Sequence, residues 1–566
     1  MKNKNYDVII IGGGPGGLAA GTMLAKEGIS SVIIEKDPVL GGRLRSVDFH
    51  GARVDCAVHV PTSLSGSVET TFTHQLFTHL GLPMNYRTVP WPMGKVSKEK
   101  PGTIDFFAMD PKLGAKNFFE FFAFATGVDM EDSTKDELQK VVDFCEAMTE
   151  EDMKKAVSIR ASDWIMENVK DPMAQAVFMN IGPIIGTNVK DVHFAQLSSG
   201  LGTFNRHGAP LLWYPSDGNL QGAIIDPMAK YYTENGGEIL TARTVRTILI
   251  EDGKITGVLV ADDQNNSMME EYSAPVVICA MPIFEALSRN VLEPRHLTEG
   301  WVQSIEKSAK LAVHDMTGFY ILNKNVIDSK HGWVHIFDSD YGAPVYVGDM
   351  CTGEFTNSII PPGKQLVSSL ILGSFDANPF GIPVQMDKVK EAHQRWKNAM
   401  EKAFPGFNDA IEYEGMNLQL NFTRYAYAVV SEETDIQSPN IEGLYFGGDS
   451  VRSVGTPMSD KCFQLAFPLC EKITEYLRNV PKTVKEDLKI EKEVFLFSMN
   501  SKMGEILKNT QGKAILEKHL PGVSKNPRTI MGKGMSFKQI AAYIPKQVTP
   551  DLLLVIDAEL KEIQKK

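Results

Sequence analysis

The chain is poor in cysteine and has no pattern that would pair the few it has. Its 566 residues include 6 cysteines, and no two of them form a C-x-x-C motif. Zinc sites, iron–sulfur clusters and redox dithiols use closely spaced cysteines, so we expect no metal or thiol centre of these kinds. We interpret the six cysteines as small buried hydrophobic residues.

An excess of positive charge and long apolar runs are also missing. The chain has 58 basic against 70 acidic residues and a formal net charge of −12. This balance disfavours a nucleic-acid surface, because phosphate binding depends on basic patches. No stretch approaches the ~18 uninterrupted apolar residues of a membrane span. The first apolar segment runs into five glycines within six residues, unlike a secretory signal, so we expect a cytoplasmic protein.

A glycine-rich turn follows the first apolar run, Val8–Ile11, and leads into small and apolar residues at helical spacing. Glycine permits positive φ and lets backbone N–H groups approach a pyrophosphate at the positive end of a helix. The sequence therefore predicts a strand, a tight turn and a helix that together bind a dinucleotide. The residues of this turn are Gly12, Gly14, Pro15, Gly16 and Gly17.

An acid and a second glycine pair come after this turn. The apolar run Ser31–Ile34 ends in Glu35, 18 positions after Gly17, where an acid accepts hydrogen bonds from an adenosine ribose. A plain nicotinamide dehydrogenase has no need of a further glycine doublet. The additional predicted cofactor residues are Lys36, Gly41, Gly42 and Arg43.

These residues resemble the FAD-dependent amine oxidase and phytoene desaturase superfamily, and two later segments extend the resemblance. Residues 214–262 are similar to the family's middle segment, and the strand APVVICAMP, which ends at Pro282, returns to the nucleotide domain. IEGLYFGGDS is similar to the family's closing motif, an apolar strand that ends in Gly448 and Asp449. GLYFGGDS looks closer to the carotenoid desaturase and isomerase branch than to the amine oxidases.

The resemblance implies an FAD cofactor and assigns further contacts to it. Asp449 would face the ribityl or pyrophosphate part, and the backbone of Val245 would touch the adenine side. Gly455 stands where the family commonly has a second glycine cluster. Cys462 lies just beyond it, and covalent flavin attachment is the alternative to a buried thiol there.

The resemblance also implies an α/β fold in which a Rossmann-type FAD-binding domain is interleaved with an α+β substrate domain. We expect the FAD-binding domain at residues 1–95, 205–295 and 425–480, and the substrate domain at 96–204 and 296–424. Residues 485–566 are Lys-rich amphipathic pieces outside the resemblance. They are predicted to form a C-terminal helical appendage, packed on the catalytic body or on a second subunit; the alternative is a docking module for a partner.

Several single elements can be predicted from local signals. Ser133 or Thr134 and Ser162 are candidate helix caps, and Pro550 after Thr549 predicts the start of the last helix. KLAVHDMTGFYIL and QLVSSLILGSF have the pattern of strands.

Four residues are the main catalytic candidates. His59 lies in GARVDCAVHV, which resembles the family segment near the flavin ring, where a histidine can donate a proton or orient a substrate. Arg424, Tyr425 and Tyr427 precede the closing motif and are predicted pocket residues. Structural roles are the alternative for all of them. His207 is a further candidate in an expected loop.

Residues 104–125 are unusually aromatic, and they have two interpretations. They form core or pocket lining, or they face a membrane or a path for lipid. The aromatic residues concerned include Phe118, Phe119, Phe121, Phe122 and Phe124.

Three functional classes remain open at this point. The first is an FAD-dependent oxidoreductase that desaturates, saturates or isomerises carbon–carbon bonds of an apolar small molecule. The second is a flavin amine oxidase, in which Tyr425 or Tyr427 and Trp213 or Tyr214 would form an aromatic pair. The third is a binding or assembly protein that retains FAD. No second G-x-G-x-x-G block is present, so the electron donor or acceptor stays unidentified; peripheral membrane contact and a homo-oligomer also stay open.

Overall fold

The computed structural model describes most of the chain between residues 4 and 563. The described residues are 4–56, 62–63, 67–89, 92–96, 103–108, 110, 113–114, 116–126, 128–180, 192–207, 211–216, 218–262, 269–310, 313–328, 331–338, 345–356, 358–373, 375, 383–423, 435–448, 451, 458–480, 497–499, 501–526, 533, 536–537, 540–541, 547–548 and 550–563.

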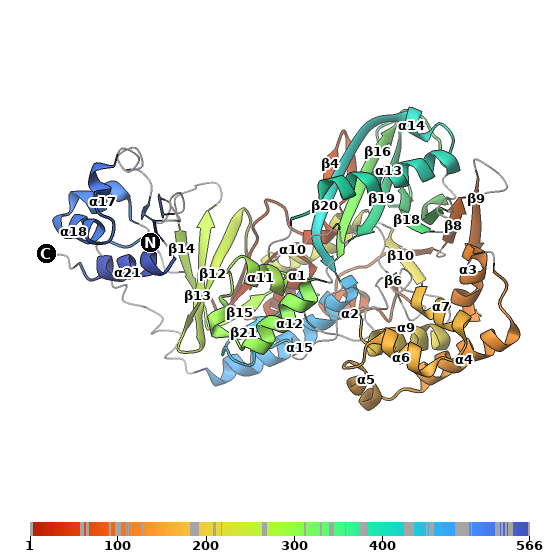
Figure 1. The fold of residues 1–566 in the computed structure, drawn as a ribbon, viewed down its shortest axis with the longest axis horizontal. Helices are drawn as coiled ribbons and strands as arrows, with labels where there is room; N and C mark the ends of the chain where they lie inside the picture. The colour runs from red at the N-terminus through yellow and green to blue at the C-terminus, as the bar shows by residue number, and fades with distance from the viewer. Residues whose placement is uncertain are drawn as a thin grey trace. The chain divides into compact units, whose positions relative to one another are not determined.

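A parallel five-stranded sheet forms the centre of the first part of the chain (Figure 1). Four of its strands are fully buried and mostly Val and Ile, as expected for strands covered on both faces, and the edge strand Glu238–Leu240 is partly buried. Helices α1 (Pro15–Lys26), α10 (Asp226–Glu234) and α15 (Met458–Asn479) pack around it, and α1 contacts both of the others. In order across the sheet, the strands are β11 (Glu238–Leu240), β3 (Ser31–Ile34), β2 (Val8–Ile11), β15 (Val276–Cys279) and β21 (Leu444–Phe446).

The strand order brings together segments that are far apart in the sequence. Ile11 lies opposite Ile34 on one side and Cys279 on the other, and Cys279 lies opposite Phe446. The carboxyl ends of β3, β2, β15 and β21 therefore meet at one edge. In an open α/β sheet this is the edge where ligands bind.

A four-stranded sheet adjoins this core. It consists of β12 (Arg243–Glu251), β13 (Lys254–Asp262), β14 (Met269–Ser273) and the short β1 (Lys4–Asn5). Smaller strands are β4 (Ser46–Phe49), β5 (Ala52–Asp55), β6 (Thr62–Ser63), β7 (Tyr86–Val89) and β10 (Leu211–Pro215). Helices α2 (Phe72–Leu80), α11 (Ile283–Ser288) and α12 (Glu299–Ala309) complete this part of the chain.

A mixed seven-stranded sheet forms a second layer, and α13 (Met386–Ala403) covers one of its faces. Trp396 of this helix stacks on Tyr320 at 5.0 Å between ring centroids, and both residues are fully buried. The two predicted strands are present, as β16 and β19. In order, the strands are β20 (Ile411–Thr423), β16 (Val313–Leu322), β19 (Gln365–Gly373), β18 (Val345–Thr352), β17 (Trp333–Asp338), β8 (Pro92–Val96) and β9 (Ile104–Ala108).

A group of helices has its own core. They are α3 (Lys116–Thr126), α4 (Asp132–Ala147), α5 (Glu150–Ala156), α6 (Ala161–Asn168), α7 (Pro172–Asn180) and α9 (Phe194–His207). Phe119 and Phe121 are buried in this core, and Phe122 and Phe124 pack against it. Their burial supports the core interpretation of the aromatic stretch; the side chain of Phe118 lies outside the described residues.

Three local predictions in this region were wrong. α4 begins at Asp132, before Ser133 and Thr134, because an acid in the first turn suits the positive end of the helix. α6 begins at Ala161, before Ser162, and the N–H of Ala161 donates to the carbonyl of Val192 at 2.9 Å. His207 is the last residue of α9 and not part of a loop, because apolar residues recur at helical spacing up to Leu201.

Residues Lys489–Lys566 form a separate compact unit. Its helices include α17 (Met503–Lys508), α18 (Thr510–His519) and α21 (Pro550–Lys561). The short helix α14 (Phe407–Ala410) belongs to the first unit. α21 begins at Pro550, as predicted, whereas Thr549 lies outside the described residues. Among the described residues of the whole chain, no helix is long and apolar enough to cross a membrane. The proposed domain boundaries stay predictions.

Candidate functional site

The first glycine turn sits at the carboxyl end of β2, at the start of α1. The N–H of Gly12 donates to the carbonyl of Ile34 at 2.9 Å, and Gly12 has a φ of +105°, which favours glycine. A Cβ at Gly17 would lie 2.0 Å from the carbonyl oxygen of Gly12. The turn can therefore close tightly against its helix only with glycine at that position.

Two other glycine segments converge on the same helix start. The N–H of Gly41 donates to the carbonyl of Gly13 at 2.9 Å, and a Cβ at Gly42 would lie 3.2 Å from the Cα of Gly14. A Cβ at Gly16 would lie 2.8 Å from the Cα of Gly448. The two glycine motifs and the segment after β21 thus meet at one place.

This cradle fits the pyrophosphate of a dinucleotide. Gly14 is the N-cap of α1, and the nearest atom to a Cβ built there is 3.9 Å away, in Gly42. The protein's own packing therefore does not require glycine at this position. Glycine would be needed here for an anion to approach the N-terminus of α1, because a side chain would stand between the anion and the backbone N–H groups.

Glu35 follows β3 directly and is held by the backbone. Its Oε2 accepts from the N–H of Gly13 at 2.7 Å, and its Oε1 accepts from the N–H of Asp37 at 2.8 Å. The side chain is buried, and burial raises the pKa of Glu35 although these two hydrogen bonds act to lower it. The carboxyl group is thus fixed beside the cradle, where a ribose hydroxyl can reach it.

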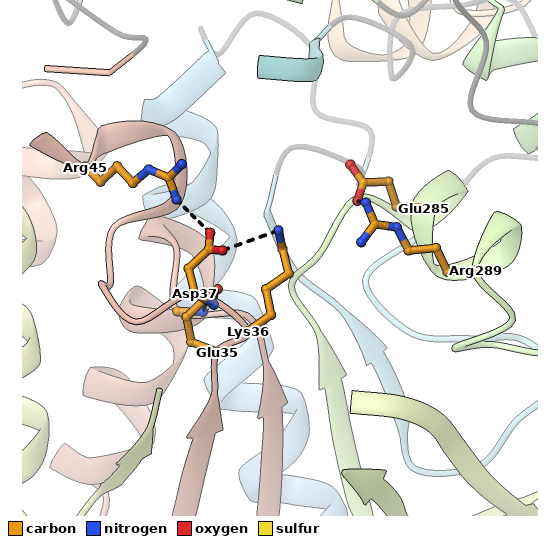
Figure 2. Close-up of polar contacts among 7 residues, drawn as sticks. Glu35, Lys36, Asp37, Arg45, Glu285 and Arg289 are labelled. Carbon is orange, nitrogen blue, oxygen red and sulfur yellow. Dashed lines mark hydrogen bonds and ion pairs between the residues drawn. The ribbon is translucent and has the colours of Figure 1, made fainter. Parts of the chain in front are cut away.

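Charged residues beside Glu35 form ion pairs that we did not predict (Figure 2). Arg45 donates from Nη1 to Oδ2 of Asp37 at 2.6 Å, and Nζ of Lys36 lies 3.7 Å from the other oxygen of Asp37. Lys36, a predicted cofactor residue, therefore points to Asp37 in this structure. A second pair is also drawn in Figure 2: Glu285 on α11 and Arg289, which follows the helix, have 3.0 Å between their charged atoms.

The structure places one further predicted cofactor residue, Val245, and leaves the main catalytic candidates undescribed. Val245 is a buried residue of β12, one of the strands predicted to run beside adenine. His207 ends α9, but its side chain is outside the described residues. The candidates outside the described residues altogether are His59, Arg424, Tyr425, Tyr427, Asp449 and Gly455. Their roles stay predictions.

Asp55 is a buried acid that the sequence did not nominate. Its Oδ1 accepts from the hydroxyl of Ser46 at 2.6 Å and its Oδ2 from the hydroxyl of Tyr214 at 2.5 Å. Burial raises the pKa of Asp55 to about 7, against the effect of both hydrogen bonds. Tyr214 is 0% exposed and Trp213 is 2% exposed. Both rings therefore lie in the core.

Two more buried acids lie on the sheet face opposite α13. Asp315 on β16 pairs with Leu372 of β19, and Asp349 on β18 pairs with Leu370. Because Leu370 and Leu372 are two positions apart, all four residues share one face. The leucines are only partly buried, so this face offers apolar surface beside two acids.

This face meets the segment that carries the second glycine pair. The amide of Asn417, which lies opposite Thr317, donates to the carbonyl of Cys56 at 3.1 Å. The charge of Arg43 acts on Asp315 and lowers its pKa, although burial keeps that pKa well above the usual range. A lone acid in an apolar strand was the only sequence signal for Asp315. The six cysteines, Cys462 included, are all buried.

Comparison with known proteins supports this description. Residues 10–73 match the model of the NAD(P)-binding Rossmann-like domain. Prolycopene isomerase of Daucus carota is 23% identical over 286 residues, which are 46% of this chain and 44% of that protein. The match therefore spans less than half the length of this curated relative.

Solved structures cover more of the chain. An oxidoreductase from Methanosarcina mazei has a TM-score of 0.58 at 16% identity, over 82% of this chain and 99% of that one. Cyclohexylamine oxidase from Brevibacterium oxydans has a TM-score of 0.51 at 16% identity, over 84% and 99%. The interleaved Rossmann-like and antiparallel sheets are those of this fold. The chain therefore has the fold of these solved structures, and its N-terminal motif is that of a Rossmann-like nucleotide-binding domain.

Proposed function

We propose that the chain binds FAD and catalyses desaturation, saturation or isomerisation at carbon–carbon bonds of an apolar small molecule. The observation that carries FAD binding is the convergence of three glycine segments on the start of α1, next to the fixed carboxyl group of Glu35. The glycine turns would hold the pyrophosphate, and Glu35 would accept hydrogen bonds from the adenosine ribose. When bound, FAD supplies the hydride or electron transfer.

The chain's own residues would position the substrate and exclude water. Leu370 and Leu372 offer partly exposed apolar surface on the sheet face that meets the Arg43 segment. Apolar side chains of this kind bind a hydrocarbon by removing its surface from water. Asp315 on the same face is buried, which raises its pKa, and it is therefore placed to hold a proton.

Amine oxidation is the second candidate, because the solved relatives of this fold include an amine oxidase. An amine site of the predicted kind needs aromatic faces open to the flavin. Trp213 and Tyr214 are buried, and the Tyr214 hydroxyl is bound to Asp55, so neither ring is free to form such a pair. The apolar carbon–carbon substrate therefore explains the described residues better.

The test is the spectrum of the purified chain, followed by anaerobic titration. We expect oxidised-flavin absorbance that acid precipitation releases into the supernatant, and reoxidation of the pre-reduced protein by a polyene or enone. Bleaching by a primary amine and no response to the unsaturated compound would overturn the carbon–carbon assignment. Reconstitution with FAD that yields no bound flavin would overturn the cofactor assignment.

A further inference from the structure

Asp37 lies where three parts of the cofactor cradle meet. Its N–H donates to Oε1 of Glu35 at 2.8 Å, and its carbonyl accepts from the N–H of Ala242, directly before β12, at 3.1 Å. Its carboxylate accepts from Nη1 of Arg45 at 2.6 Å (Figure 2). Asp37 is thus tied to the predicted ribose acceptor, to the strand predicted to run beside adenine, and to the segment that carries the second glycine pair.

Arg45 closes the loop that begins at Asp37 and contains the second glycine pair. Within this loop, the N–H of Gly41 donates to the carbonyl of Gly13 in the first glycine turn at 2.9 Å. The carbonyl of Arg45 accepts from the N–H of Cys56, just after β5, at 2.9 Å. One end of the loop is therefore fixed to the end of β3 and the other to the hairpin of β4 and β5, and the ion pair joins the two ends.

We propose that the ion pair of Arg45 and Asp37 is a latch that holds the second glycine pair against the first glycine turn, and that tight binding of FAD depends on it. This inference rests on the proposed FAD binding and adds two positioning residues to it. The pair acts on the cofactor through the backbone of the loop. Because the ends of the loop are joined, the cradle is formed before FAD arrives, and binding does not have to order it.

The contact of Arg45 with Asp37 is shorter and less exposed than the neighbouring ion pairs. The two side chains are 25% and 33% exposed. Nζ of Lys36 lies 3.7 Å from Asp37, with 54% of its side chain exposed, and the pair of Arg53 and Asp48 on the adjoining hairpin is 3.4 Å long, with its acid 79% exposed. Since solvent screens exposed pairs most, the pair of Arg45 and Asp37 is the one expected to fix the loop.

A latch and a direct contact of Arg45 with FAD predict opposite effects of removing the charge of Asp37. If Arg45 bound the pyrophosphate itself, Asp37→Asn would free the guanidinium and remove a negative charge near an anionic ligand, so FAD would bind more tightly. If the pair is a latch, Asp37→Asn loosens the loop and the affinity falls. The expected loss is about 2- to 10-fold, as for a partly buried, charge-assisted hydrogen bond.

The experiment is a titration of the apoprotein with FAD, followed by flavin fluorescence, for Arg45→Gln, Asp37→Asn and the double variant. We expect each single variant to bind FAD about 2- to 10-fold more weakly, and the double variant to bind no more weakly than the weaker single variant, because the same contact is removed each time. Arg45→Lys, which keeps the charge, should recover part of the affinity. Arg53→Gln is the matched control: it removes an ion pair from the same hairpin and should leave the affinity unchanged. Thermal unfolding of each apoprotein measures its stability separately.

Three outcomes would overturn this inference alone. Tighter binding of FAD by Asp37→Asn would make Arg45 a direct ligand of the cofactor. Wild-type affinity in both single variants, with or without a lower melting temperature, would leave the pair no role in binding. Losses that multiply in the double variant would mean that the two side chains act independently. A wild-type chain that binds no FAD would instead overturn the proposed function.

Discussion

Tyr214 and Asp55, 159 positions apart in the sequence, share a buried hydrogen bond of 2.5 Å between the phenol and the carboxyl group. Ser46 donates to the other carboxyl oxygen at 2.6 Å. Three strands, β4, β5 and β10, are thereby joined at one acid. Because this acid is buried, its protonation and the stability of the fold are linked.

The first prediction concerns the pH dependence of stability at Asp55. Its pKa is about 7 in the fold and 3.8 ordinarily, so the folded chain favours the protonated acid. This contribution is fully present below pH 3.8 and is lost as the pH rises to about 7, with an upper bound of about 4 kcal/mol. Asp55→Asn should flatten that part of the curve, measured by urea unfolding across the range. Identical curves for the variant and wild type would contradict it.

The second prediction tests Glu35 as the ribose acceptor. Glu35→Ala removes a charge-assisted hydrogen bond to FAD of about 1.5–3 kcal/mol, which corresponds to roughly 10- to 150-fold weaker binding. Fluorescence titration with FAD measures the loss. Glu35→Gln keeps an acceptor for one backbone N–H and serves as the control, with a smaller loss expected. Full flavin occupancy of Glu35→Ala at purification would show that the residue has no such role.

The third prediction separates two glycines of one turn. Gly16→Ala places a Cβ 2.8 Å from the Cα of Gly448, so the backbone must shift and the apoprotein should lose about 1–3 kcal/mol of stability. Gly14→Ala meets no protein atom closer than 3.9 Å and should cost about 1 kcal/mol or less as a helix cap. It should nevertheless abolish tight FAD binding. Thermal unfolding of both apoproteins, with and without FAD, distinguishes the two. Wild-type affinity in Gly14→Ala would mean that no anion approaches this glycine.

The fourth prediction concerns His393 on α13, away from the cradle. The hydroxyl of Tyr320 and Nε2 of His393 are 2.6 Å apart, and burial lowers the pKa of His393, while Glu414 raises it and Lys397 lowers it. A lowered pKa in the fold means that stability falls as the pH drops below the ordinary value of 6.5. His393→Gln should remove this acid-side loss without changing the affinity for FAD. An equal loss in the variant would assign the effect to another group.

Local patterns predicted the nucleotide-binding part of the fold well, and the reason is physical. Val8–Ile11 and Ser31–Ile34 are strands with these same bounds, because apolar runs bounded by glycine have few alternatives. The glycine turn and Glu35 also lie together, since only a few residues of chain separate each from its strand. The parallel neighbours β15 and β21 followed from the family resemblance.

The acids outside that motif could not be predicted in the same way. Asp55 is hydrogen-bonded to Tyr214, and Asp315 is buried in a strand of another sheet, and no local spacing in the sequence indicates either environment. Burial turns these ordinary side chains into groups with shifted pKa values, and burial is a property of the assembled sheets. The predicted catalytic residues His59, Arg424, Tyr425 and Tyr427 lie outside the described residues and stay predictions.

The close approach of Gly16 and Gly448 also has a consequence for biosynthesis. About 430 residues separate them, so a ribosome that adds roughly 5–20 residues per second completes the cradle about 20–90 s after the first glycine turn is made. During that time the nascent N-terminal turn lacks the backbone that closes over it. On the proposed FAD binding, cofactor loading would wait until β21 has been made, and truncated chains ending before β21 should emerge without flavin.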